Sequence, residues 1–293
     1  MFSSNLEQSV VNCSAIIVSG NTWDEAFENA KSDLKVISSW LNDHMLKLNV
    51  SKTKYLTFSP TAVNQPLGKD IKFHNYNGEN CNCPNLIRED HVKYLGITID
   101  KHLKWNVHIQ NILKSLRKLA YKFVQLRNVV DKRVLRMVYH ALVQNILQYG
   151  LLSWGGTYLA HLKPLMIQQN NIVRICLKKS IDTKVEAMYE EFSILPIRKL
   201  YLKTTLLYIK RNERNWNKID HMYRTRSVTK ENLEVMRINK TFTACHAYYT
   251  APKLFNKMPE QIKKEKNFNR YKKMIAQWID HLTFDEVELI LKQ

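Results

Sequence analysis

After Asp100 the spacing of apolar residues becomes helical and stays so, and this change most constrains the fold. Before it, short apolar runs alternate with turn-forming residues around one long amphipathic stretch. After it, apolar residues recur at every third or fourth position almost to the C-terminus, which is the period of a helix. The chain also has only 7 Gly and 7 Pro in 293 residues, which suits long helices better than a turn-rich β-sandwich. We therefore predict an α+β fold: a small β-sheet carrying one long helix, followed by a mostly helical region.

The part before Asp100 contains three candidate strands and one candidate helix. Residues 14–18 (SAIIV) predict a short buried strand, and residues 54–58 (KYLTF) predict a second. Between them, a capping-box pattern begins at Thr22, and an apolar stripe predicts a helix over residues 22–48. Residues 92–99 (VKYLGITI) are partly apolar on both faces, which predicts a strand covered on both sides.

The part after Asp100 predicts helices separated by short breaks. Asp131 is placed to cap the second of them, and YGLLSWGG at 149–156 ends it. The expected helical stretches are 106–127, 131–148, 161–178 and 198–212, with a final helix after residue 268.

The charge of the chain favours a polyanionic partner. The net charge is +19, and an excess of this size is more typical of nucleic-acid binding than of solubility alone. Residues 101–127 contain no acidic residue. The basic residues expected there to contact phosphates are Lys104, Lys114, Arg117, Lys118 and Lys122, the last four sharing one helix face. The alternative is a solvated helix face, which normally mixes both signs of charge.

Two other groups of residues leave alternatives open. A second basic cluster lies within residues 257–273, but acidic residues dilute it, and phosphate contact or solvation are equally good interpretations. Five aromatic residues of the helical part could stack on bases, although core packing is the better interpretation for most of them. They are Trp105, Tyr121, Tyr139, Tyr149 and Trp154.

Cysteine usage and hydropathy indicate the cellular compartment of the chain. Five scattered cysteines predict a reducing compartment rather than a disulfide framework. Cys81 and Cys83, with His74 and His91 nearby, have the wrong spacing for a usual zinc site. No apolar run reaches a membrane span and no secretory signal is visible, so we expect an intracellular protein of nucleus or cytoplasm, not secreted and without a membrane partner. No nucleophile or nucleotide-loop motif is present, so no small-molecule substrate is expected.

The order of these elements resembles the reverse transcriptase of non-LTR retrotransposons, particularly jockey-like elements. The run from AIIVSGNTWDEAF to KTKYLTF is similar to the later half of the palm, and KYLGITIDKHLKWNVHI to the passage from palm to thumb. YGLLSWGG is similar to a thumb motif, and APKLFNKMPEQI to the tail of these reading frames. The resemblance covers about residues 14–280 and divides the chain into a divergent N-terminus (1–13), a partial palm (14–104), a helical thumb (105–215) and a C-terminal tail region with a terminal helix (216–293).

The resemblance also implies a loss of catalytic residues. The family has two aspartates just before the strand at 15–18, and Asn12 and Cys13 stand at those positions. The family reaction uses Mg²⁺, which prefers anionic oxygen ligands, so neither an amide nor a thiol replaces a carboxylate well. We expect no bound metal or other cofactor and no intact catalytic site. The family's third catalytic aspartate and its fingers are also expected to be absent from the chain.

The resemblance also covers residues that hold nucleic acid in the family. Lys52 matches a palm lysine of related polymerases and is expected to be vestigial, while Tyr94, Leu95 and Gly96 match a hairpin that grips the primer. The helix at 106–127 resembles the thumb helix that follows the template–primer duplex. The sequence therefore predicts a truncated, inactive protein that binds an RNA–DNA or DNA duplex through its phosphates. The alternatives are an RNA-directed DNA polymerase completed by a missing upstream segment and a helical protein-interaction adaptor.

Overall fold

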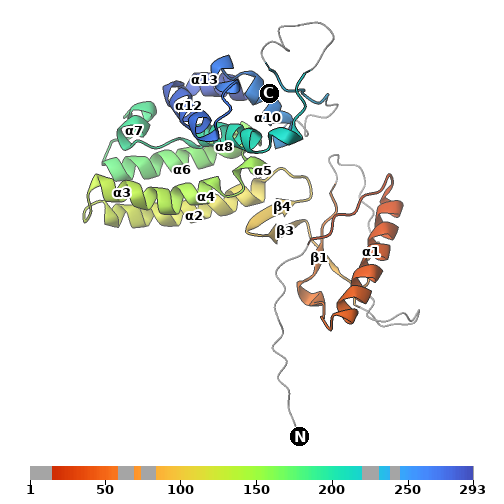
Figure 1. Ribbon diagram of the computed structural model, residues 1–293. Coiled ribbons are helices and arrows are strands. Elements are labelled where there is room, and N and C mark those ends of the chain that lie inside the picture. The colour runs from red at the N-terminus through yellow and green to blue at the C-terminus, as the bar shows by residue number, and fades with distance from the viewer. Residues whose placement is uncertain (1–14, 59–68, 74–83, 220–230, 238–244, 293) are drawn as a thin grey trace. The chain divides into compact units, whose positions relative to one another are not determined.

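The computed structural model describes residues 15–58, 69–73, 84–219, 231–237 and 245–292 (Figure 1). The chain forms two compact units, Met1–Leu103 and Lys104–Gln293. The first contains α1 and four short strands, and the second is built from helices. This confirms the predicted α+β class. The boundaries predicted for palm, thumb and tail concern ancestry, and they stay a prediction.

In the first unit, helix α1 (Trp23–Asp43) packs on a small apolar core, and the four strands pair into two two-stranded sheets. After η1 (Val50–Lys52), β1 (Lys54–Tyr55) pairs in parallel with β2 (Ile87–Arg88). Strands β3 (His91–Tyr94) and β4 (Ile97–Asp100) form an antiparallel hairpin. The core of this first unit consists of Phe27, Ile71, Phe73 and Leu86, and half-buried residues of α1 line it.

The start of α1 shows why its sequence is helical. The Thr22 hydroxyl accepts a hydrogen bond from the Glu25 amide at 3.2 Å, as the capping pattern predicts. The Glu25 carboxylate accepts from the amide of Asn21 at 2.8 Å rather than from Thr22, so the reciprocal bond is displaced by one residue. The helix ends at Asp43, five residues before the predicted end, where Met45 has a φ of 54°.

Three strand predictions in this unit are wrong in part. Residues 15–18 form no strand, and Ile17 is 90% exposed. None of the strands in the described part of the chain pairs with them, and a buried strand needs such hydrogen-bond partners. Only Lys54 and Tyr55 of the predicted strand at 54–58 are paired. The segment 92–99 is a hairpin rather than one strand, and only Thr98 in it is buried.

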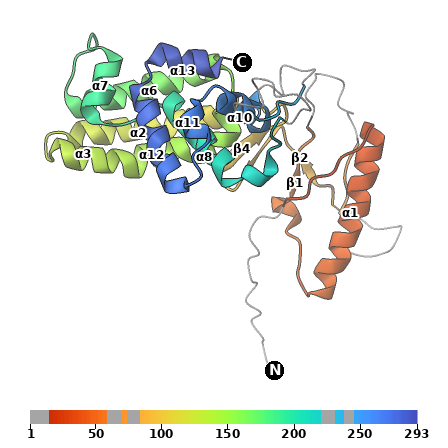
Figure 2. The same ribbon diagram turned by 45° about the horizontal axis from the view of Figure 1, so that its top comes forward.

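The second unit begins with three long helical rods that lie side by side (Figures 1 and 2). They are α2 (Asn106–Leu126), the rod formed by α3 (Lys132–Val138), η2 (Tyr139–Gln144) and α4 (Asn145–Gln148), and α6 (Leu159–Leu177). The short α5 (Leu151–Trp154) follows Gly150, whose φ of 62° breaks the helix as predicted. The η2 segment is π-helical.

The π-helical turn shifts the buried face of its rod. The sequence predicts an apolar stripe through Val134, Leu135, Val138, Leu142 and Ile146. Leu135 is buried as predicted, but Val134 and Leu142 are 38% and 43% exposed. The residues that the rod buries are Leu135, Tyr139, Val143 and Leu147. They recur at every fourth residue because a π turn contains more residues than an α turn.

The remaining helices pack on α8 (Ile197–Arg211) or on its neighbours α6 and α12. These are α7 (Val185–Phe192), α10 (Ala247–Asn256), α11 (Glu260–Lys263), α12 (Phe268–His281) and α13 (Phe284–Leu291), with η3 (Glu213–Asn215) after α8. Helices α10, α12 and α13 contact α8 directly. The C-terminal region thus ends in two helices rather than the single one predicted.

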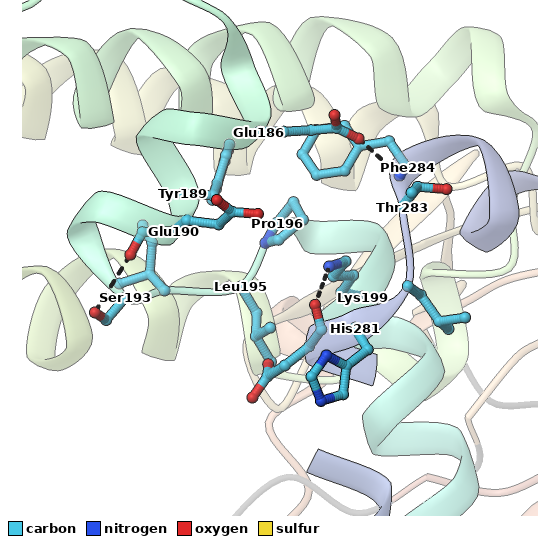
Figure 3. A pocket seen from close by; sticks show the side chains of 13 residues that line it. Glu186, Tyr189, Glu190, Ser193, Leu195, Pro196, Lys199, His281, Thr283 and Phe284 are labelled. Carbon is cyan, nitrogen blue, oxygen red and sulfur yellow. Dashed lines mark hydrogen bonds between the residues drawn. The ribbon is translucent and has the colours of Figure 1, made fainter. Parts of the chain in front are cut away.

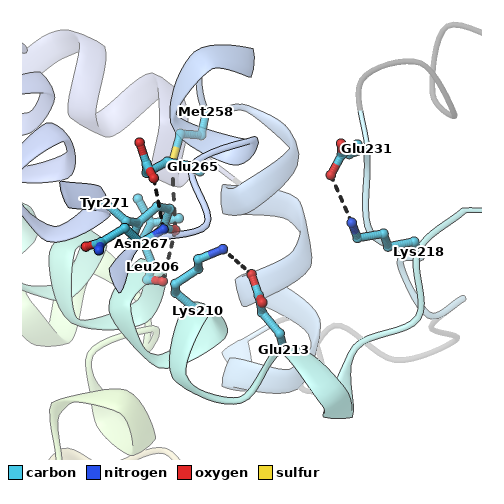
Figure 4. A network of polar contacts seen from close by, with 9 residues as sticks. All are labelled: Leu206, Lys210, Glu213, Lys218, Glu231, Met258, Glu265, Asn267 and Tyr271. Carbon is cyan, nitrogen blue, oxygen red and sulfur yellow. Dashed lines mark hydrogen bonds and ion pairs between the residues drawn. The ribbon is translucent and has the colours of Figure 1, made fainter. Parts of the chain in front are cut away.

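Buried polar side chains join these helices. Gln169 of α6 donates to the Tyr139 hydroxyl at 2.8 Å and to the Leu195 carbonyl at 3.1 Å, and its oxygen accepts from the Ile197 amide at 2.9 Å. The amide of one buried side chain therefore ties three helices together and caps α8. Near the other end of α8, the Tyr271 hydroxyl donates to the Leu206 carbonyl at 3.2 Å, and Lys210 pairs with Glu213 (Figure 4).

None of the helices within the described ranges combines the length and apolarity that crossing a lipid bilayer demands.

Candidate nucleic-acid interface

Helix α2 carries the predicted basic face, and the structure exposes it. Ile109, Ile112, Leu113, Leu116 and Phe123 are buried against the rest of the unit. Lys114, Arg117, Lys118 and Lys122 are all exposed. At about 100° of rotation per residue, they occupy an arc of roughly 140° opposite the buried stripe. We call these four residues the basic face of α2.

No acidic side chain in the described part of the chain neutralises the basic face. No salt bridge joins any of its four cations to an acidic side chain of the described residues. By contrast, Lys132 and Lys179 both pair with Glu191 elsewhere in the unit, at 3.3 and 3.1 Å. The basic face spans about 12 Å of helix, and an equal length of B-form duplex carries roughly seven phosphates. Its cations are therefore available to an external polyanion.

Tyr121 adds an aromatic ring to this face. It lies one turn after Arg117 and is 69% exposed, so it does not serve the core. Sequence reasoning favoured core packing for it, although its spacing from Arg117 and Lys118 places it on the basic stripe and gave a usable signal. An exposed ring among cations is the combination that single-stranded nucleic acids use for base stacking.

The other four aromatic candidates divide between core and surface. Trp105, Tyr139 and Trp154 are buried, whereas Tyr149 is 55% exposed. The Trp154 indole donates to the Tyr149 carbonyl at 2.9 Å, which fixes the turn between α4 and α5.

Lys104 lies just before α2 and is exposed. Its carbonyl accepts a hydrogen bond from the Thr157 hydroxyl at 3.1 Å, and His161 Nδ1 lies 3.2 Å from the same oxygen. The backbone at the entry to α2 is therefore held against the start of α6, which fixes the N-terminal end of the basic face.

The residues predicted to grip a primer form the tip of the β3–β4 hairpin in the first unit. Leu95 and Gly96 have φ values of 44° and 83°, and Tyr94 pairs with Ile97 across the turn. Two positive φ values in a two-residue loop match the twist of the strands, and Gly takes such a conformation without strain. Leu95 is 57% exposed and Tyr94 half-buried, so an apolar side chain stands at the hairpin tip.

The residues predicted to mark the lost catalytic centre are mostly outside the described part of the chain. Asn12 and Cys13 lie outside it, as do His74, Cys81 and Cys83 of the weak zinc alternative. Lys52 is exposed at the end of η1, where its amide donates to the Asn49 side chain at 3.2 Å. Among the residues that are described, no group of three or more His, Cys, Asp or Glu is placed to hold a metal ion.

Two lysines of the second basic cluster, Lys257 and Lys263, make structural contacts. Lys263 is buried, and its ammonium donates to the Asn256 carbonyl and the Asn232 side chain, both at 2.8 Å. Lys257 donates to the carbonyls of Leu289, Ile290 and Lys292, so it closes the C-terminus of α13. These two lysines therefore contribute to the fold, and the choice between phosphate contact and solvation for the rest of the cluster stays open.

Two known proteins are similar to this chain. It is 26% identical over 166 residues to the probable RNA-directed DNA polymerase from transposon BS of Drosophila melanogaster, covering 55% of this chain and 17% of that protein. It is 25% identical over 144 residues to the RNA-directed DNA polymerase from mobile element jockey of the same organism, covering 48% and 14%. The chain is similar to reverse transcriptases of non-LTR retrotransposons.

The similarity confirms the resemblance predicted from the sequence, and it is partial. The matched segment spans less than a fifth of the length of either relative. No protein-family model matches the chain, and no solved structure gives a significant match. The two matches thus show a sequence similar to non-LTR retrotransposon reverse transcriptases over about half of the chain.

Proposed function

We propose that this chain binds duplex nucleic acid, RNA–DNA or DNA, through the phosphate backbone, using the basic face of α2. The observation that carries the proposal is the set of four exposed cations on a helix that has no acidic residue and no salt bridge within the described residues. Cations of this kind release counterions from a duplex and give affinity that does not depend on base sequence. The hairpin tip at Leu95–Gly96 supplies a second, apolar contact for the nucleic acid.

The chain alone does not polymerise DNA in this proposal. Asn12 and Cys13 stand where the related polymerases have two aspartates, and two-metal catalysis needs carboxylates to hold Mg²⁺ beside the reacting phosphate. What remains is a binding protein derived from the later part of a polymerase. The second candidate is an active enzyme whose carboxylates come from a segment outside this chain, as the polymerase names of both relatives suggest.

A primer-extension assay on an RNA template with Mg²⁺ separates these candidates. We expect the purified chain to retain a labelled RNA–DNA duplex in a mobility-shift gel and to extend no primer. The test variant is the chain with Lys114, Arg117, Lys118 and Lys122 all replaced by Gln, which we expect to lose the mobility shift. Primer extension by the unmodified chain would refute the claim that Asn12 and Cys13 replace the catalytic aspartates. An unchanged mobility shift with the four-Gln variant would refute the claim that the basic face binds the duplex.

A further inference from the structure

The pocket beside α7 holds its own cation. It has a volume of about 420 Å³ and lies between α7, the start of α8 and the link between α12 and α13 (Figure 3). Carboxylates line it, and the buried Lys199 lies among them, with its ammonium donating to the Asp280 carbonyl at 3.3 Å. The outer surface of the rod formed by α3, η2 and α4 is different, because cations and exposed apolar side chains lie together there without carboxylates.

The side chains of this rod fall into rows along its length. The buried row, at most 2% exposed, consists of Leu135, Tyr139, Val143 and Leu147. A four-residue step overshoots one α-helical turn by about 40°, and the longer π turn of η2 compensates for that drift, so the rows stay straight. The residues one position earlier form an apolar row of Val134, Val138, Leu142 and Ile146. The residues two positions earlier form an outer row of Arg133, Met137, Ala141 and Asn145.

The apolar row and the outer row expose aliphatic side chains to solvent. Met137 is 62% exposed, Leu142 43% and Val134 38%, while Val138 and Ile146 are half-buried. The apolar row runs along about 18 Å of rod with one side chain roughly every 6 Å. Apolar side chains that are grouped in this way and rimmed by polar ones are typical of a surface that binds another protein.

The charge beside these rows is positive and uncompensated. Between Asp100 and Asp182 the sequence contains one acidic residue, Asp131, and its carboxylate caps α3 by accepting from the Val134 amide at 2.8 Å. Arg133 is exposed and Arg136 half-buried, and neither forms a salt bridge to a carboxylate of the described residues. A solvated helix face normally mixes both signs of charge. The rod therefore offers apolar contact and positive charge on one surface.

These two properties define the chemistry of an occupant, which must bring apolar side chains and anionic groups together. A phosphate backbone supplies the anions but no aliphatic groups to cover Val134, Met137 and Leu142. A second copy of this chain brings a net charge of +19 against the same charge. An acidic amphipathic helix meets both demands. Its apolar residues, three and four positions apart, match the spacing of the apolar row, and carboxylates beside that stripe can pair with the two arginines.

We propose that the outer surface of this rod docks an acidic amphipathic helix of a partner protein. A partner helix of about 12 residues is long enough to cover the apolar row. This contact goes beyond the duplex binding proposed for α2 and does not depend on it, because it is decided by aliphatic side chains that phosphate binding does not use.

Fluorescence anisotropy of the full chain with labelled peptides tests the proposal. The probe has three repeats of Glu-Glu-Leu-Leu followed by Glu-Glu, acetylated and amidated at its ends, and the control probe has Ser in place of every Leu. We expect the leucine probe to bind at least tenfold more tightly than the serine probe. Met137→Gln and Leu142→Gln should each weaken the leucine probe about tenfold, since each removes an apolar contact. Arg133→Gln with Arg136→Gln should weaken it about fivefold, since two charge pairs are lost.

Matched control variants separate this surface from general stickiness and total charge. Leu289→Gln removes an exposed leucine of α13, and Lys272→Gln with Lys273→Gln removes two exposed charges of α12, and both should leave the affinity for the leucine probe unchanged within about twofold. Thermal melting of each variant shows whether the fold is kept.

Four results would overturn the proposal. They are no binding of the leucine probe, equal binding of the leucine and serine probes, a loss of affinity in Leu289→Gln as large as in Leu142→Gln, and tighter binding of a probe with Lys in place of Glu. The mobility shift of the RNA–DNA duplex should be the same for Met137→Gln and Leu142→Gln as for the unmodified chain. If these variants lose the duplex and keep the peptide, nucleic acid covers this surface and the proposal is wrong.

Discussion

The double substitution Lys118→Gln with Lys122→Gln tests the basic face of α2 quantitatively. If each of its four cations neutralises one phosphate, they contribute a slope of about −3.6 to the plot of log affinity against log salt concentration. Between about 50 and 200 mM salt, that slope weakens binding roughly 150-fold. Removing two of the cations halves the contribution to about −1.8, and the same change in salt then weakens binding only about 12-fold. Both side chains are exposed and form no salt bridge within the described residues, so the fold should be kept.

The measurement is a titration of a fluorescent RNA–DNA duplex at several salt concentrations, and the quantity compared is the slope. The matched control is Lys35→Gln with Lys47→Gln in the first unit, which removes the same net charge from two exposed positions. Helix α1 carries acidic residues in its first turn, so this helix is not an acid-free surface. The double variant on α2 should lower the slope by about 1.8 and the control by much less. Equal slopes for both variants would show that total charge, not this face, determines affinity.

Three further predictions concern single residues. Tyr121→Ala should weaken single-stranded RNA binding by about 1–3 kcal/mol in a filter-binding assay, whereas Tyr121→Phe, which keeps the ring, should not. Gln169→Leu should lower the free energy of unfolding by roughly 2–4 kcal/mol in urea, because the Tyr139 hydroxyl, the Leu195 carbonyl and the Ile197 amide lose their partner. The exposed Gln125→Leu should change it little. Burial raises the pKa of Cys176 to about 12, so iodoacetamide at pH 8 should label it only after denaturation. Each argument has an outcome that would contradict it. For Tyr121 it is an RNA affinity of Tyr121→Ala equal to that of the unmodified chain. For Gln169 it is equal stability of the two Gln variants, and for Cys176 it is labelling in the folded chain.

The helical part of the fold was accessible from the sequence because helices are local. The predicted stretches at 106–127 and 198–212 agree with α2 and α8 to within one residue, and Asp131 caps α3 by accepting from the Val134 amide at 2.8 Å. Hydrogen bonds four residues apart and a 3.6-residue stripe depend only on nearby sequence. The basic face of α2 was predicted for the same reason, since residues three and four apart must share a side of a helix.

The strands were predicted less well because their partners are distant in sequence. Residues 15–18 are apolar enough for a strand, yet Ile17 is 90% exposed, since a strand is stable only when a neighbour completes its hydrogen bonds. The role of Lys263 was hidden for a similar reason. Nothing near it in sequence indicates that its ammonium is buried and bound to Asn232, 31 residues away.

The sequence by itself determined the α+β class, the family likeness, the net charge and the side of α2 on which the cations lie, because composition and helical period are properties of neighbouring residues. Only the tertiary structure decided that Lys257 and Lys263 serve the fold and that Lys199 lies buried beside carboxylates from other helices. Those facts depend on which distant segments pack together. Burial and charge pairing are set by that packing, and no local pattern encodes them.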